Sequence, residues 1–417
     1  MSQSLADPAA RPASEPAFVE FVLIIALMMG LISLSIDNLL PAFEPIRSDL
    51  GVADANRMQL ILTAYMAGFA FMQLVYGPLS DMIGRRPILL IGLFIYTAGT
   101  LLAIFAHSFE VLLIARAIQG LGGAAARVLA VAIVRDRFEG RDMARVMSLV
   151  FMIFIIVPVI APATGTFFLM LGSWRLIFMS MLSLVLVVLV WFGLRMPETL
   201  HPENRMPFSV APIGAAILRT TTTRVAIGNS TAMGLTMGCL MTYLGSAQQI
   251  FETEIYKLGN WFALAFAIIA ICMGLANFTN ASLVRRLGMR RIAHFGMLGF
   301  TLLGAVLLGL AFLFQGKPPL LLFGAVLAGS HFLLALAMPN FNSLSMEPLG
   351  DIAGTASSFI GFYTTILGAV IGMWIGQAFD GTIFPLAWGY LGLGSLCVGV
   401  ITWTERGRLF QAHARPA

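Results

Sequence analysis

Long apolar runs, separated by short polar segments, dominate the pattern of hydrophobic and polar positions along the chain. A helix that crosses a membrane needs about 20 consecutive, mostly apolar residues. By this criterion the pattern predicts twelve membrane-spanning helices. They are expected at residues 18–40, 58–80, 87–106, 110–134, 144–170, 174–194, 225–249, 260–282, 291–314, 319–341, 351–377 and 383–403. The fold class that we expect is therefore an all-α polytopic membrane protein.

The longest polar interruption lies in the middle of the chain and divides the predicted spans into six and six. We expect an N-terminal six-helix bundle at 18–194, a cytoplasmic linker at 195–224 and a C-terminal six-helix bundle at 225–403. The Pro/Ala/Ser-rich segment 1–17 predicts a disordered cytoplasmic tail, and 404–417 a second cytoplasmic tail.

Composition supports the membrane class and excludes several others. Hydrophobic residues make up 59% of the 417 residues and charged residues only 11%, whereas an ordinary soluble protein carries about 25% charged residues. A water-soluble globule of this length could not cover so much apolar surface. A cytosolic enzyme, a nucleic-acid binder and a disordered chain are therefore excluded, and the lipid bilayer is the expected partner.

The positive charge has the distribution of cytoplasmic loops. Of the 25 Lys and Arg residues, 18 fall on the side of the two termini, 5 on the opposite side, and the last two, Arg116 and Arg127, inside a span. Such an asymmetry marks the cytoplasmic face. We expect a multi-pass protein of the inner (plasma) membrane with both termini in the cytoplasm, and no nucleic-acid partner.

The two predicted halves contain a related basic turn. Gly84-Arg85-Arg86 follows the second span, and Gly288-Met289-Arg290-Arg291 follows the eighth. Each turn marks the second connection of a six-helix half. This repetition predicts two halves that are related by a parallel repeat around a central cavity.

The first of these turns belongs to a longer motif, GPLSDMIGRR at 77–86. It resembles the loop signature of the major facilitator superfamily, a Gly-x-Leu-x-Asp-x-x-Gly-Arg-Arg run between spans two and three. The resemblance implies a conformational latch. The latch residues would be Gly77, Asp81, Gly84, Arg85 and Arg86. The alternative is an ordinary basic turn at the cytoplasmic surface.

Three further segments resemble the drug/proton antiporters of this superfamily, in particular the Bcr/CflA (bicyclomycin/chloramphenicol resistance) branch. They are SIDNLLPA at 35–42, RAIQGLGG at 116–123 and PVIAPATG at 158–165. The third departs from the antiporter signature, since Ala161 and Thr166 replace two glycines. The resemblance implies a monomeric, proton-coupled exporter of small hydrophobic drugs that works by alternating access. Its partners would be a small-molecule substrate and protons, and the proton gradient would replace any cofactor.

Asp37 and Arg116 are the candidates for proton coupling and substrate binding. An ionisable group inside a membrane is costly, so it marks a functional site by default. At 1.5 Å per residue, Asp37 lies about 6 Å from the outer end of span one and Arg116 about 9 Å from that of span four. Opposite charges at similar depth can set each other's proton affinity. The alternative is structural: Asp37 would cap the end of its span, and Arg116 would only fix helix packing.

Arg127 departs from the resembled family, in which we expect a small or apolar residue. It follows Arg116 by 11 residues, which is close to three full turns, so both point to nearly the same side. Arg127 could attract an anionic or polar substrate about 16 Å nearer the cytoplasm. It could equally extend to the inner membrane surface.

Other polar, aromatic and helix-bending residues complete the candidate site. Possible cavity-lining residues are Asn38, Gln119, Arg127, Asn229, Tyr243, Gln248, Phe359, Phe362 and Tyr363. The three aromatic residues of span eleven have helical spacing, and their face could instead contact lipid or another helix. Candidates for helix bending and gating are Pro158, Pro162, Gly165, Gly368, Gly372 and Gly376. Tight packing without a gating role is the alternative for the glycines.

The second half carries no acid or base at mid-depth apart from His331, for which we expect a hydrogen-bonded structural role. No Walker loop, metal-ligand pair or nucleophile motif is found in the sequence, so we expect no metal site and no enzyme activity. Two alternatives stay open. One is proton-coupled transport of a polar metabolite such as a sugar or amino acid. The other is a membrane-embedded enzyme or a non-transporting receptor.

Overall fold

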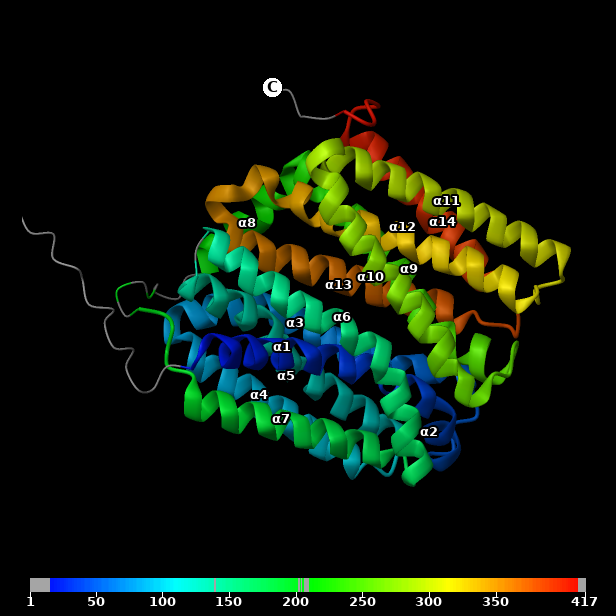
Figure 1. Cartoon of the computed structure of the whole chain (residues 1–417), viewed down its shortest axis with the longest axis horizontal. Helices are drawn as coiled ribbons and strands as arrows, with labels where there is room; N and C mark the ends of the chain where they lie inside the picture. The colour runs from blue at the N-terminus through cyan, green and yellow to red at the C-terminus, as the bar shows by residue number, and fades with distance from the viewer. Residues whose placement is uncertain (1–15, 139, 202, 204, 206–209, 412–417) are drawn as a thin grey trace, which may run out of the picture.

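The computed structural model of the protein describes residues 16–138, 140–201, 203, 205 and 210–411 (Figure 1). In this part of the chain the structure is helical throughout and contains no strand. The predicted all-α class is therefore confirmed. Of the two predicted tails, 1–15 and 412–417 lie outside the described residues.

The first half of the chain forms six long helices and three short ones. They are α1 (Phe18–Asp37), η1 (Leu40–Ala42), α2 (Phe43–Asp49), η2 (Ala55–Gln59), α3 (Leu60–Ile83), α4 (Arg85–Ile104), α5 (Phe109–Arg137), α6 (Gly140–Leu171) and α7 (Arg175–Arg195).

The second half again contains six long helices. After α8 (Val210–Thr222) come α9 (Arg224–Ala247), η4 (Gln248–Thr253), η5 (Gly259–Trp261), α10 (Phe262–Leu287), α11 (Met289–Leu313), α12 (Leu320–Met346), η6 (Glu347–Ile352), α13 (Ala353–Gln377) and α14 (Phe384–Thr404). The helix α8 lies inside the segment expected to be a linker. It packs beside α13 and buries Thr220 completely.

Ten of these helices are long and apolar enough to cross a membrane by themselves. The other two long helices, α6 and α9, lie in the same bundle (Figure 1). Most of α9 is buried against its neighbours, so it needs less apolar surface than a helix that faces lipid. The twelve long helices of the described chain agree with the twelve predicted spans.

The two halves of the bundle lie side by side and meet along two interfaces (Figure 1). Helix α3 packs against α13, and α6 packs against α10. In each interface the second long helix of one half packs against the fifth long helix of the other. A parallel repeat around a central axis produces this pairing.

Helix α1 begins and helix α14 ends at one end of the bundle, which we call the terminus end, and the opposite end is the far end (Figure 1). At the terminus end the two basic turns have the same backbone form. Gly84 and Gly288 each precede a helix with φ values of 121° and 81°. Only glycine adopts such angles without strain. The echo in the sequence therefore corresponds to a repeated turn in the structure.

Close helix contacts explain several of the predicted glycines. Gly165 of α6 lies against the backbone of Asn38, and a side chain at this position would overlap it. Gly368, Gly372 and Gly376 form one stripe on α13, along which a Cβ atom would overlap Met237, Met241 and Gln59 in turn. Pro158 and Pro162 lie within the continuous helix α6. The gating role of these residues stays a prediction.

Candidate substrate and proton site

Asp37 is the last residue of α1, and the chain then continues through η1 and α2. Only 6% of the residue is exposed. One carboxylate oxygen accepts a hydrogen bond of 2.7 Å from the Ser33 hydroxyl. The segment that follows Asp37 reaches the second half, since η1 packs against η4. The carboxyl group is therefore enclosed near the far end, where the first helix approaches the second half.

Arg116 of α5 is completely buried among main-chain acceptors. Its guanidinium donates to Ser35 O at 2.7 Å and to Ile61 O at 3.3 Å. A short hydrogen bond joins it to Gln119, and the Tyr65 ring lies 4.5 Å from its central carbon. Arg116 thus holds α1, α3 and α5 together.

Asp37 and Arg116 have separate partners, and no ion pair joins them in the described residues. Their similar depth suggested a mutual effect on proton affinity, but the structure shows no direct contact. The reason is local, because two carbonyl groups and an amide already occupy the guanidinium of Arg116. Within the part of the chain that the structure describes, Asp37 is therefore a carboxyl group without an ion-pair partner.

A cavity of about 290 Å³ opens between the halves at the terminus end. Helix α5 contributes Arg127 and Arg135, and α3 contributes Gln73 and Asp81. Methionines of α9 and a row of hydroxyl groups of α13 form the opposite wall. Arg127 is exposed in this cavity, so of the two orientations left open by the sequence the structure shows the one toward the cavity.

The predicted aromatic wall of α13 does not line this cavity. The lining residues of that helix are small and polar, among them Ser357, Ser358 and Thr365. Phe359 and Tyr363 instead stack on each other with ring centres 6.1 Å apart. Phe362 is half-buried. Helical spacing defines a shared face but not its rotation toward this cavity, so a substrate contact of these three residues stays a prediction.

Five other predicted lining residues lie elsewhere in the two halves. In the first half, Asn38 accepts a hydrogen bond from Thr164, and the Gln119 amide donates to Thr100. In the second half, Asn229, Tyr243 and Gln248 are almost fully buried on α9 and η4. None of the five borders the terminus-end cavity. They form instead the interior of each half in this conformation.

Tyr243 belongs to a buried aromatic cluster of the second half. Its ring centre lies 4.4 Å from that of His331, whose Nδ1 is 2.9 Å from Leu327 O. The Nε2 atom of the histidine is 3.4 Å from the Tyr390 hydroxyl. His331 thus has the hydrogen-bonded position expected for it, inside a neutral core.

The predicted latch residues form a compact network. Arg85 binds Asp81 at 2.5 Å and Asp136 at 2.9 Å. The Glu198 carboxylate accepts hydrogen bonds from the backbone N–H groups of Arg85 and Arg86 at 2.9 and 3.1 Å. It therefore caps the N-terminus of α4, where a negative charge is favourable.

Sequence reasoning missed Asp136 and Glu198 as members of this network. Asp136 lies between two arginines at the end of α5, and this pattern is typical of a basic cytoplasmic loop. The second half has a matching arrangement, in which Arg290 binds Glu347 at 2.9 Å and Glu405 at 3.1 Å. In each half one acid lies at the end of the fourth long helix, Asp136 or Glu347, and another follows the sixth, Glu198 or Glu405. This repeated placement was the signal that could have found both.

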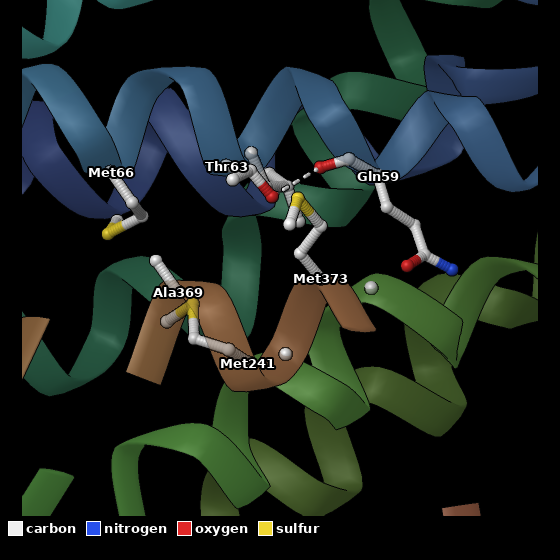
Figure 2. Close-up of a pocket in the computed structure, with 9 residues that line it drawn as sticks. Gln59, Thr63, Met66, Met241, Ala369 and Met373 are labelled. Atoms are coloured by element: carbon white, nitrogen blue, oxygen red, sulfur yellow. Dashed lines mark hydrogen bonds between the residues drawn. The ribbon is translucent and has the colours of Figure 1, made fainter. Parts of the chain in front are cut away.

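The far end is closed by a seam between the halves. Asn56 donates hydrogen bonds to Gln377 O and Phe379 O and accepts one from Gln249 at 2.7 Å. Next to these amides, the two halves leave a cavity of only about 10 Å³. Figure 2 shows the side chains that fill it, Gln59, Thr63 and Met66 of α3, Met241 of α9, and Ala369 and Met373 of α13.

Glu252 lies in η4 at this closed end. Burial raises the pKa of its carboxyl group to about 7, an effect to which Glu44 adds and which Gln248 opposes. One of its oxygens has no hydrogen-bond partner in the described residues. Glu44, by contrast, is bound by Arg47 at 2.6 Å. Glu252 is therefore the less well compensated of these two acids.

In the described residues no group of three or more His, Cys, Asp or Glu side chains could hold a metal ion. What the structure brings together is a two-half helical bundle, a cavity open at one end, a sealed opposite end and an enclosed carboxyl group. These features define a membrane transporter with alternating access as the class of protein.

Comparison with known proteins agrees with this class. The profile of the Major Facilitator Superfamily matches residues 25–373, so the chain belongs to this superfamily. It is 29% identical to an uncharacterized MFS-type transporter, YdgK of Bacillus subtilis, over 85% of this chain and 89% of that protein. It is also 29% identical to a bicyclomycin resistance protein homolog of Haemophilus influenzae, over 88% and 91% of the two chains.

Solved structures confirm the fold. The xylose transporter XylE from E. coli, in a partially occluded inward-open conformation, has a TM-score of 0.72 over 93% of this chain and 97% of its own. Sequence identity is 14%, so the likeness concerns the fold alone. The superfamily membership and the antiporter-branch resemblance predicted from the motifs are confirmed by the profile and the resistance-protein relative.

Proposed function

We propose that the protein exports small hydrophobic compounds across the inner membrane in exchange for protons, as a monomer with both termini in the cytoplasm. Asp37 carries the proposal. In the described residues it is an enclosed acid without a cation partner, and it lies near the sealed far end, away from the lining of the cavity that opens at the terminus end. The bias of basic residues toward the terminus end supports a cytoplasmic opening.

The proposed cycle uses Asp37 as the proton carrier. In the cytoplasm-facing state the carboxyl group gives up its proton as a substrate occupies the cavity. The halves then rock about the α3–α13 and α6–α10 interfaces, and the seam at Asn56 and Gln249 opens. Proton uptake from outside accompanies substrate release there. Arg116 keeps α1, α3 and α5 in register through its carbonyl contacts during this movement.

The relatives support a drug as the substrate, because one of them is named for bicyclomycin resistance. The test uses inverted membrane vesicles that hold an acidic interior, together with chloramphenicol and bicyclomycin as probes. Wild-type protein should dissipate the pH gradient when a transported probe is added, and Asp37→Asn should not. A probe-driven proton flux that is equal in both proteins would overturn the proposal.

A second candidate is transport of a polar metabolite. One observation favours it, because hydroxyl and amide groups and two arginines line the cavity in place of an aromatic wall. The same vesicle assay with sugars and amino acids separates the candidates. Proton flux with these solutes, and none with the drugs, would favour the metabolite.

A further inference from the structure

The terminus-end cavity carries more positive than negative charge. Its ionisable lining residues are Asp81, Arg85, Arg127 and Arg135. Asp81 is already bound by Arg85, which also binds Asp136 outside the lining. Neither Arg127 nor Arg135 forms an ion pair or a hydrogen bond within the described chain. Two guanidinium groups of the cavity are thus left without a protein anion.

The two arginines lie at different depths. Arg127 is ten residues before the end of α5, which corresponds to about 15 Å along the helix axis, and Arg135 is near the mouth. A cation at membrane depth is costly unless it is paired or hydrated. Arg127 is exposed to the cavity, so water or a bound anion can reach it. An anion would replace weak hydration by a two-pronged, charge-assisted contact.

The remaining walls suit an amphipathic body better than a fully polar one. Val128 and Val131 flank Arg127 on α5, and Met233 and Met237 face the cavity from α9. Methionine side chains adapt to different apolar shapes. Hydroxyl groups of Ser358 and Thr365 add acceptors and donors for a polar edge. The volume of about 290 Å³ admits a compound of one or two rings.

From these observations we propose that the preferred substrates are small amphipathic organic anions, whose carboxylate binds Arg127 while their apolar rings contact Met233 and Met237. Arg135 attracts the anion at the mouth, and Arg127 holds it. This inference rests on the proposed exporter function and specifies the substrate class of the same cavity.

The test compares two probes of equal shape and different charge. Binding of 2-naphthoate and of 2-naphthamide to the purified full-length protein is measured by isothermal titration. The variants are Arg127→Gln, Arg127→Lys, Arg135→Gln and, as the matched control, Arg286→Gln. Arg286 is an exposed arginine at the end of α10, outside the cavity lining.

Wild-type protein should bind naphthoate at least 10-fold more tightly than naphthamide. Arg127→Gln should weaken naphthoate binding about 10- to 100-fold, the range of hydrogen bonds to a charged group. It should leave naphthamide binding unchanged. The affinity of Arg127→Lys for naphthoate should lie between those of wild type and Arg127→Gln, because lysine keeps the charge but loses the two-pronged donor geometry of the guanidinium. Arg135→Gln should mainly slow association, and Arg286→Gln should behave as wild type.

Equal affinity of wild-type protein for the two probes would overturn the inference, and this comparison needs no variant to fold. An equal loss of both probes in Arg127→Gln would overturn it as well. The vesicle assay separates this failure from failure of the exporter proposal. Asp37-dependent flux of neutral drugs without an acid preference would leave the exporter proposal standing. Arg127-dependent naphthoate binding without any proton-coupled flux would leave only the anion site.

Discussion

The two halves share a scaffold but differ in how their helices approach each other. In the first half, a side chain added at Gly120 would overlap the backbone of Tyr65, so α3 and α5 touch main chain to main chain. In the second half, a side chain at Gly299 of α11 would meet only the end of the Leu333 side chain of α12, whose Cδ1 atom would lie at 2.8 Å. Backbone contacts fix a geometry, whereas the end of a side chain can change its rotamer.

The halves also differ in their interior chemistry. The first half encloses Asp37 and Arg116, whereas the core of the second half contains the neutral group Tyr243, His331 and Tyr390. Yet both halves repeat the glycine turn and an arginine that binds two acids. The halves therefore share the glycine turn and the arginine network at the terminus end. They do not share the ionisable group at the end of the first long helix, which is Asp37 in the first half.

The largest effect should come from breaking a backbone contact of the first half. Gly120→Ala forces α3 and α5 apart, and we expect a loss of about 3 kcal/mol in stability. Gly299→Ala should lose about 1 kcal/mol or less, because the Leu333 side chain can change its rotamer. Thermal unfolding in detergent measures both. Gly309→Ala on α11, where a side chain would meet nothing within 4 Å, is the control. Equal losses at Gly120 and Gly299 would refute the contrast.

The repeated arginine turns should respond alike. Arg85→Gln leaves Asp136 without its cation, and Arg290→Gln does the same to Glu405. Because the acids are partly exposed, each change should cost about 1–2 kcal/mol in thermal unfolding, less than for a fully buried pair. Arg291→Gln, an exposed neighbour, serves as control. A loss confined to one half would mean that the turns are not equivalent.

The far-end seam should respond to pH through Glu252. With a pKa of about 7 in this closed form against an ordinary value of 4.5, the closed form binds the proton more tightly. The free-energy preference for the closed form that results from this proton is fully present below pH 4.5 and is lost as pH rises to 7. Within that window the ratio of closed to open seam should fall by up to about tenfold per pH unit.

The pH effect can be measured by labelling a cysteine at Thr63, which lies in the seam (Figure 2). The three native cysteines, Cys239, Cys272 and Cys397, are replaced by serine beforehand. Labelling by an impermeant maleimide, corrected for thiolate reactivity with a reference thiol, should accelerate from pH 5 to 7. Glu252→Gln should remove this dependence, and Glu44→Gln should keep it. An unchanged pH profile in Glu252→Gln would contradict the assignment.

The smallest effects concern two tyrosine hydroxyls. Tyr96 of the first half bonds Ser35 at 2.5 Å, whereas Tyr390 lies 3.4 Å from His331. Tyr96→Phe should lower stability by about 1 kcal/mol, and Tyr390→Phe by about 0.5 kcal/mol or less. Thermal unfolding of the two variants in parallel compares them. A larger loss at Tyr390 would show that the second half depends on polar contacts more than its geometry suggests.

The sequence predicted the helices and the latch turn because both depend on local information. Apolar length fixes a span, and a glycine with positive φ fixes a turn. It did not predict which face of α13 borders the cavity, since that rotation is set by packing against α3 and α9. Arg127 shows the same limit. The sequence predicted the side of the helix on which it lies, but only the packing of the bundle shows that its side chain borders the cavity and does not extend to the membrane surface.

Partners from distant segments were also beyond the sequence. Glu198 reaches Arg85 and Arg86 across more than one hundred residues. Arg116 and Asp37 share a depth, yet main-chain carbonyls of α1 and α3 occupy the guanidinium. Hydropathy places residues along the membrane normal but says nothing of their direction around it, so depth alone could not establish a contact.

The central claim is that the proton chemistry resides in the first half, at Asp37. The most direct test measures proton release from the detergent-solubilised protein when chloramphenicol, bicyclomycin or 2-naphthoate is added. Wild type, Asp37→Asn and His331→Asn, the matched change in the second half, are compared in weakly buffered solution. The account predicts release from wild type and from His331→Asn, and none from Asp37→Asn. Release that persists in Asp37→Asn, or that is lost only in His331→Asn, would contradict it.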